Sequence, residues 1–473
     1  MDSRIASQRV ERSSTRSLPI FYRNLEESLD ERRASHIFNH VVQNGWQTSS
    51  AVDFCSGNIL SIGSSNDRRV AFLAELDQNA NLGTGSSGVR LMDGNYSYLE
   101  HTEREIAEHH GAEAGLLLAS AWEANVAVWS AVPRPGDVII HDTLVHASSY
   151  EGFKQSMAME VVEFAHNDVD DFRRALHQVW ETQPLVRQGK RSILVALEGV
   201  YSMDGDVCPL QDLVDVARDM PGIDGDIPNG NIQFVVDEAH SVGVLGPQGS
   251  GLVCELGLEK DVAIVVHSYG KALGAIGSVV LGSKTIKGIL TNFGKSFVYT
   301  TSPSFPLVAA IRSGYALLKK GSAEQGQNRI QLLSKLFYEL LTSHPLWDLA
   351  RDKGILSVPL ADGWEHRPFL THIVAISSPQ YSVWWMYFHL AAASFCVFPV
   401  EYPTVPIGKS RLRLIIHAHN TEDHVRGFIS SLFGWVQEML SIEQGETQAD
   451  VPKAAGDVYR WMRQEGLTGF GMP

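Results

Sequence analysis

Two apolar segments that each end on polar residues decide the fold: NIQFVVDEAH (231–240) and VAIVVHSYGK (262–271). Each opens with a short run of β-branched residues, which is typical of a strand buried on both faces of a sheet. The first strand ends at Asp237, and the second ends near Ser268, three residues before Lys271. Parallel sheets bind ligands at the carboxyl ends of their strands. We therefore expect these polar side chains to share one sheet edge.

Outward from these segments, short apolar runs alternate with helical patterns. Strands are expected at 115–118, 137–141, 159–164, 192–198, 232–237, 262–267 and 278–281, and helices at 98–110, from about 122, at 168–179 and at 210–220. Such alternation predicts an α/β fold, with a mostly parallel sheet that helices cover on both faces.

The regular alternation of strands and helices ends after residue 321. There a long helix (323–343) is expected before strands near 372–375, 396–400 and 412–417. We interpret this part as a smaller α/β domain. The expected organisation is a disordered tail (1–17), an N-terminal segment (18–81) with a helix near 24–44, a large domain (82–321), a small C-terminal domain (322–442) and an extension (443–473) with a helix at 453–464.

Composition excludes several classes of protein. The 473 residues are 44% hydrophobic with a net charge of −15, which argues against a nucleic-acid-binding surface. No run of 18 apolar residues exists, so no membrane span is expected. Four scattered cysteines indicate reduced thiols in a cytoplasmic protein rather than a disulfide framework.

Three short motifs mislead. Gly83–Gly88 fits GxGxxG, but the preceding stretch is helical, whereas a dinucleotide site requires a strand there. Asp237–His240 spells DEAH, but no GxxxxGK[ST] motif precedes it. The pairs His109-His110 and His417/His419 lack a nearby carboxylate or cysteine at ligand spacing, so no metal site is expected.

Three residues at strand ends form a coherent constellation. A buried Lys271 would lose its proton readily, and a neutral amine forms an imine with an aldehyde. A buried Asp237 needs a cationic partner, such as a pyridinium nitrogen. His146 could stack on a planar ring. Taken singly, these residues could equally be a surface lysine in a turn, a helix-capping aspartate and an ordinary loop histidine.

Their order along the chain resembles that in the α-oxoamine synthase family. The resemblance runs from about residue 53 to 432 and rests on LEGVYSMDGDVCPL (197–210), VVDEAHSVGVLGPQGSG (235–251), HSYGKALGAIGS (267–278) and PTVPIGKSRLRL (403–414). The family includes 8-amino-7-oxononanoate synthase and serine palmitoyltransferase. The overall sequence is most similar to fungal members found beside polyketide synthases. The resemblance implies the aspartate-aminotransferase-like fold type I and the cofactor pyridoxal 5′-phosphate.

The resemblance also implies roles for individual residues. Lys271 would form the Schiff base and then act as the base at Cα, Asp237 would pair with the pyridinium nitrogen, and His146 would stack on the ring. The remaining expected positions are His240 and Ser202 near the phenolic oxygen, Glu198 near the substrate, Ala121, Trp122 and Ser268 at the phosphate, Thr300 and Thr301 at the phosphate of a neighbouring subunit, and Arg413 at the amino-acid carboxylate.

One departure from the family pattern affects the amino-acid pocket. Gly57 falls where the family usually has an asparagine, and we expect Asn58 to replace it. The implied reaction is a decarboxylative Claisen condensation of an amino acid with an acyl thioester, carried by CoA or by a carrier protein of a polyketide synthase, in a homodimer with shared sites. An aminotransferase and a non-catalytic partner subunit are the alternatives.

Overall fold

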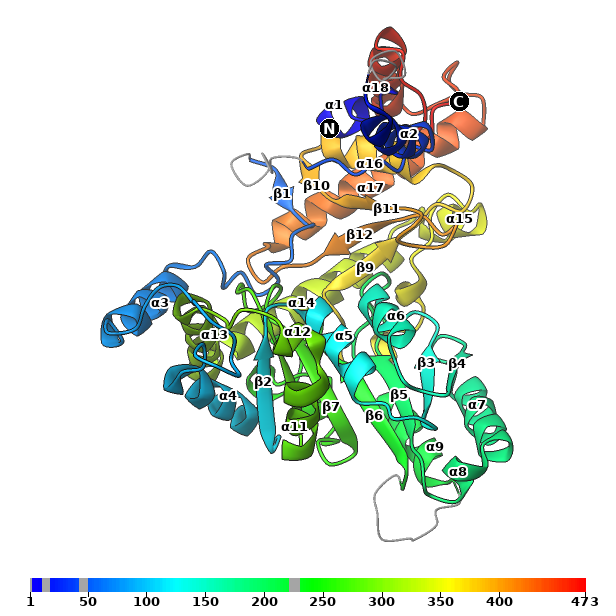
Figure 1. The fold of residues 1–473 in the computed structure, drawn as a ribbon. Helices are drawn as coiled ribbons and strands as arrows, with labels where there is room; N and C mark the ends of the chain where they lie inside the picture. Colours follow the sequence, from blue (N-terminus) through cyan, green and yellow to red (C-terminus); the bar gives the residue numbers. More distant parts are fainter. Residues whose placement is uncertain (1, 11–17, 42–49, 221–229) are drawn as a thin grey trace. The chain divides into compact units, whose positions relative to one another are not determined.

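The computed structural model describes residues 2–10, 18–41, 50–220 and 230–473, drawn in Figure 1. The chain forms two compact units. The large unit comprises Gly57–Gln331 and His417–His419, and the small unit comprises Met1–Ser56, Leu332–Ile416 and Asn420–Pro473.

A seven-stranded sheet forms the centre of the large unit (Figure 1). Its strands, in spatial order, are β2 (Ala114–Leu118), β8 (Ser278–Gly282), β7 (Val262–Ser268), β6 (Ile232–Asp237), β5 (Ile193–Glu198), β3 (Val138–Asp142) and β4 (Glu160–Phe164). Strand β8 alone runs in the opposite direction to the other strands of this sheet, so its pairings with β2 and β7 are antiparallel. The predicted mostly parallel sheet is therefore confirmed, and each expected strand boundary lies within one residue of the observed one.

Burial explains the apolar runs of the central strands. All six residues of β5 are buried, whereas the edge strand β4 alternates between half-buried and exposed positions up to Phe164. A central strand with helices on both faces needs apolar side chains on both faces.

Helices surround this sheet. They are α3 (Asn66–Gln78), α4 (Ser97–His109), α5 (Ala121–Ala131), α6 (Ala147–Lys154), α7 (Val169–Thr182), α8 (Pro184–Arg187), α9 (Leu210–Arg218), α10 (Leu252–Glu255), α11 (Lys284–Phe293), α12 (Lys295–Val298) and α13 (Phe305–Leu317). The chain passes to the small unit within α14 (Ala323–Thr342).

The small unit has a three-stranded antiparallel sheet in the order β11 (Phe398–Val400), β12 (Arg411–Ile415) and β9 (Ile373–Ile376). A second, parallel pair joins β1 (Val52–Asp53) to β10 (Phe395–Cys396). Its helices are α1 (Asp2–Ala6), α2 (Ile20–Ala34), α15 (Trp347–Asp352), α16 (Val383–Ala392), α17 (Glu422–Glu443) and α18 (Lys453–Gln464).

The N-terminal end of the chain differs from the sequence-based expectation, whereas the expected helix at 453–464 is present as α18. The described part of the expected disordered tail contains helix α1, and Ile5 on this helix is buried in the core of the small unit. Residues 11–17 of that tail and 42–44 of the expected first helix lie outside the described residues. The C-terminal helix α18 buries Tyr459 and Met462 in the same core. Among the described residues, no helix combines the length and apolar character that crossing a membrane requires.

Candidate active site

The candidate residues of the large unit gather where strands of its sheet end. Glu198 and Asp237 are the last residues of β5 and β6, and they are paired across the ladder. Asp237 also pairs with Val266, two residues before the end of β7. Laterally paired residues project from the same face of a sheet. The two carboxyl groups therefore lie side by side.

Asp237 is held by neutral donors. Its Oδ2 accepts a hydrogen bond from Asn125 Nδ2 at 2.7 Å, and its Oδ1 accepts one from the backbone N–H of Ala239 at 2.9 Å. The residue is 9% exposed. A buried carboxylate is costly without a cationic partner. This arrangement fits the protonated ring nitrogen of a pyridine cofactor.

The same asparagine connects Asp237 to His146. Asn125 Nδ2 also donates to Ser148 Oγ at 2.9 Å, and that hydroxyl lies 2.7 Å from His146 Nδ1. The backbone N–H of Ser148 donates to His146 Nδ1 at 3.2 Å, so this nitrogen is an acceptor. Burial lowers the pKa of His146, which favours the neutral ring. His146 therefore carries its proton on Nε2 and can donate it.

Lys271 belongs to the same cluster, because it interacts electrostatically with residues of it. Lys271 is half-buried in the loop after β7 and interacts with both His146 and Glu198. Burial, with the neighbouring Asp237, raises the pKa of the Glu198 carboxyl well above its usual range, although Lys271 opposes this shift. Glu198 is therefore held as a neutral acid beside Asp237.

The loop that carries Lys271 depends on glycine. Its turn is closed by two hydrogen bonds, from Tyr269 N to Gly277 O at 3.0 Å and from Ala275 N to Tyr269 O at 2.8 Å. Gly274 has φ +58°, and a Cβ there would lie 2.4 Å from Gly63 Cα. Any side chain at this position would displace the turn that presents Lys271.

The N-terminus of helix α5 lies at the same edge of the sheet. Because β2 and β7 are each antiparallel to β8, β2 is parallel to β7, so α5 begins at the edge where β7 ends. Ser120 caps α5 by accepting the N–H of Glu123 at 3.2 Å. The first N–H groups of a helix lack intrahelical acceptors and attract anions. Ala121 and Trp122 supply such groups, and the rings of Trp122 and His146 form a T-shaped pair with 6.0 Å between centroids.

Two further predicted residues lie in neighbouring turns. Ser202 follows β5 and is half-buried, and His240 follows β6 and is buried. His166, which sequence reasoning missed, stabilises this edge by contacting Asp142 Oδ1 at 2.9 Å and Asp206 Oδ2 at 2.5 Å. It thereby ties the loop that leads to His146 to the loop that contains Ser202.

Four further predicted residues make contacts of their own. Thr300 and Thr301 follow α12, and Thr301 forms an isolated antiparallel bridge with Val89. The Asn58 side chain bonds locally, donating to Ser64 Oγ and accepting from Gly63 N, both at 3.0 Å. Arg413 lies in β12 of the small unit, where burial lowers its pKa to about 10.

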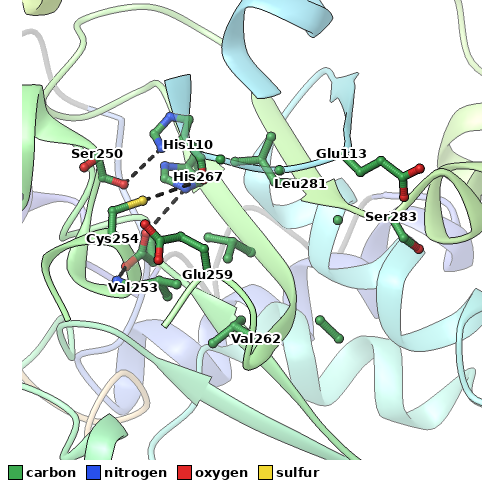
Figure 2. Close-up of a pocket in the computed structure, with 16 residues that line it drawn as sticks. His110, Glu113, Ser250, Val253, Cys254, Glu259, Val262, His267, Leu281 and Ser283 are labelled. Carbon is green, nitrogen blue, oxygen red and sulfur yellow. Dashed lines mark hydrogen bonds and ion pairs between the residues drawn. The ribbon is translucent and has the colours of Figure 1, made fainter. Parts of the chain in front are cut away.

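A cavity of about 240 Å³ opens on the other face of the sheet (Figure 2). Its lining includes His110, Glu238, Cys254 and His267, but none of the predicted site residues. Successive strand residues point to opposite faces, so His267 projects away from the face of Val266 and Asp237. This cavity is therefore separate from the lysine cluster.

Asn125, Ser148 and His166 carried no signal in the sequence that distinguished them from structural residues. Asn125 occupies the fifth position of α5, and only the folded chain shows that it faces the end of β6. Within the described ranges, no group of three histidine, cysteine or acidic residues has an arrangement that could hold a metal ion.

Comparisons with known proteins identify the family to which the chain is similar. The family model "Aminotransferase class I and II" matches residues 50–432. An aminoacyl transferase sphA of Byssochlamys spectabilis is 47% identical over 442 residues, 93% of each chain. An 8-amino-7-oxononanoate synthase of Emericella nidulans is 38% identical, covering 83% of this chain and 90% of the relative. The structure of serine palmitoyltransferase from Sphingomonas wittichii superposes with a TM-score of 0.67 at 25% identity, covering 82% of this chain and 87% of that one.

Proposed function

The chain belongs to the aminotransferase class I and II family, and within it to the α-oxoamine synthase type of acyltransferase; from this we propose that it joins an α-amino acid to an acyl thioester with loss of CO2. Its cofactor is pyridoxal 5′-phosphate. The observation that carries the proposal is the meeting of Lys271, Asp237, His146 and Glu198 at one sheet edge.

The residues at this edge fit the cofactor. Asp237 would hold a proton on the pyridine nitrogen, and His146 would lie against the ring. The N–H groups of Ala121 and Trp122, with the hydroxyl of Ser268, would bind the phosphate. Ser202 and His240 would lie near the phenolic oxygen. Lys271 would bind the aldehyde carbon covalently.

When bound, the cofactor supplies an electron sink for the bond broken at Cα. Lys271 then removes the Cα proton. His146, with its proton on Nε2, is arranged to donate a hydrogen bond to the oxygen that becomes negative when the thioester carbonyl is attacked. Neutral Glu198 adds no second negative charge where this oxyanion forms. Arg413 would bind the carboxylate of the amino acid, because a guanidinium can bind both of its oxygens.

The amino-acid pocket differs from the family pattern at Gly57. A Cβ at Gly57 would lie 3.9 Å from Lys271 Cα and 4.0 Å from Lys271 Cγ, so this position adjoins the lysine. The amide of Asn58 is engaged in its own turn. We therefore propose that Asn58 shapes the loop beside Lys271. The loop, rather than the Asn58 amide, would then contact the substrate.

The experiment that tests the reaction supplies 1-13C-labelled amino acids with and without an acyl-CoA and measures 13CO2 and free thiol together. Release of both products only when both substrates are present supports the synthase. Keto-acid-dependent exchange of the amino group without CO2 release would instead establish an aminotransferase. An acyl group on a polyketide-type carrier protein is supplied in parallel, because this fungal subgroup could use either acyl donor.

Replacing the lysine tests the assignment of the site. We expect Lys271→Ala to abolish turnover and the visible absorption of the lysine-linked cofactor, because this variant lacks the amine that binds the cofactor. Lys154→Ala is the matched control, since that side chain is 73% exposed on α6. Substantial product formation by Lys271→Ala would refute the role of Lys271.

A further inference from the structure

Two of the four cysteines meet in the small unit, although 340 residues separate them in sequence. Strand β1 pairs with β10 in parallel, with Asp53 opposite Cys396. The backbone N–H of Phe54 donates to Cys396 O at 3.0 Å, which extends the ladder to the residue before Cys55. The thiols of Cys55 and Cys396 form a hydrogen bond to each other.

Arg413 is a positively charged neighbour of this pair. The backbone N–H of Ile415 donates to Phe54 O at 2.8 Å, so the chain at Phe54–Cys55 runs along β12. Arg413 lies two residues earlier on the same strand and interacts electrostatically with Cys55. A thiol beside a guanidinium has the environment of a reactive cysteine.

The two thiols are not equivalent. The hydrogen bond from Cys396, supported by Arg413, lowers the pKa of Cys55 against the opposing effects of burial and Asp53. The same hydrogen bond raises the pKa of Cys396. Because Arg413 lies beside Cys55, we assign Cys55 as the nucleophile and Cys396 as the thiol that resolves it.

We propose that Cys55 and Cys396 form a peroxide-responsive thiol pair that closes into a disulfide beside Arg413. The Cys55 thiolate attacks hydrogen peroxide, forming an S–O bond as the O–O bond breaks and hydroxide leaves. The sulfur of Cys396 then attacks Cys55, forming the S–S bond and displacing the second hydroxide. The two thiol protons convert the hydroxides to water, so two thiols and one peroxide give one disulfide and two waters.

The disulfide also changes the charge near Arg413. The thiolate of Cys55 competes with a bound anion for the guanidinium of Arg413, whereas a disulfide sulfur is neutral and does not compete. Oxidation therefore leaves Arg413 freer to bind a carboxylate, and the KM for the amino acid falls while kcat changes little. This second consequence rests on the proposed function, whereas disulfide formation does not.

The test treats the purified holoenzyme with hydrogen peroxide, alkylates the remaining thiols under denaturing conditions and maps the peptides by mass spectrometry. We expect a linked Cys55–Cys396 peptide, which dithiothreitol separates. Cys208 and Cys254 are internal controls, because burial raises the pKa of both thiols. Oxidation of these controls at the rate of Cys55, or absence of the linked peptide, would overturn the proposal.

Two variants separate the roles of the thiols. In Cys396→Ser, the sulfenic acid on Cys55 cannot be resolved and should react with a dione reagent specific for sulfenic acids. In Cys55→Ser, Cys396 should stay reduced. Equal labelling of the two variants would contradict the assignment of the nucleophile.

The KM measurement tests the coupling to Arg413. A KM for the amino acid that is unchanged or higher after oxidation would refute the coupling. Absence of any condensation product in either redox state would reject the proposed function alone, because the mapped disulfide is measured independently.

Discussion

Asn125 makes two hydrogen bonds from one amide nitrogen, to Asp237 Oδ2 and to Ser148 Oγ. Through Ser148 it also influences His146, whose Nδ1 is held as an acceptor. One side chain thus orients both the carboxylate expected at the cofactor nitrogen and the ring expected at its face. Because Asn125 touches neither the substrate nor the reacting atoms in this scheme, it is a positioning residue.

We predict that Asn125→Leu weakens cofactor binding roughly tenfold or more, because hydrogen bonds to charged groups contribute about 1.5–3 kcal/mol each. The pH dependence of the lysine-linked absorption should also shift, since Asp237 and His146 both lose a partner. Cofactor titration and an absorbance pH profile measure these effects. Asn292→Leu, at an exposed position of α11, is the control. A normal pH profile with reduced stability would show that Asn125 is merely structural.

Loops at the ends of β3, β4 and β5 are held together by one ion triad. His166 lies between Asp142 and Asp206, and its side chain is 23% exposed. Burial opposes protonation, but the two hydrogen-bonded carboxylates raise the pKa of His166 to about 10. At neutral pH the imidazolium therefore stabilises the loops that contain His146 and Ser202.

We predict that His166→Ala lowers the free energy of unfolding by about 3 kcal/mol near pH 6, as expected when one partner of a buried ion pair is removed. The pKa of His166 in the folded protein lies above its ordinary value of 6.5. The stabilisation is therefore complete below pH 6.5 and is lost as the pH rises towards 10. Denaturant unfolding from pH 6 to 10 measures this trend, with His177→Ala at an exposed position of α7 as the control. A difference from wild type that does not depend on pH would contradict the ion triad.

At the scale of the whole molecule, the resemblance predicts two chains with shared sites. Thr300 and Thr301 correspond to the position from which the family reaches the neighbouring subunit's phosphate. Thr301 is exposed, and the preceding Tyr299 is 80% exposed. A large exposed aromatic side chain beside this pair is what a contact between two chains would cover.

We therefore predict complementation between two defective variants. Lys271→Ala lacks the amine, and Thr300→Ala/Thr301→Ala weakens phosphate binding in the partner's site. In a mixed dimer, one of the two sites contains neither defect. Random mixing makes about half of the dimers mixed, so about a quarter of all sites should be intact. Activity of refolded mixtures, compared with each variant alone, measures the recovery. A mixture that shows only the sum of the two separate activities would refute shared sites.

The sequence by itself determined the pattern of strands and helices, the mostly parallel sheet and the placement of Lys271 and Asp237 after neighbouring strands. These follow from local periodicity and from the rule that strand ends share an edge. Tertiary structure alone decided which distant residues meet. It placed Asn125 against Asp237, His166 between two loops, Cys55 beside Cys396, and both chain ends in the small unit. Such contacts depend on the long-range pairing of elements such as β1 and β10, and short strands of two residues carry no periodicity from which pairing can be predicted.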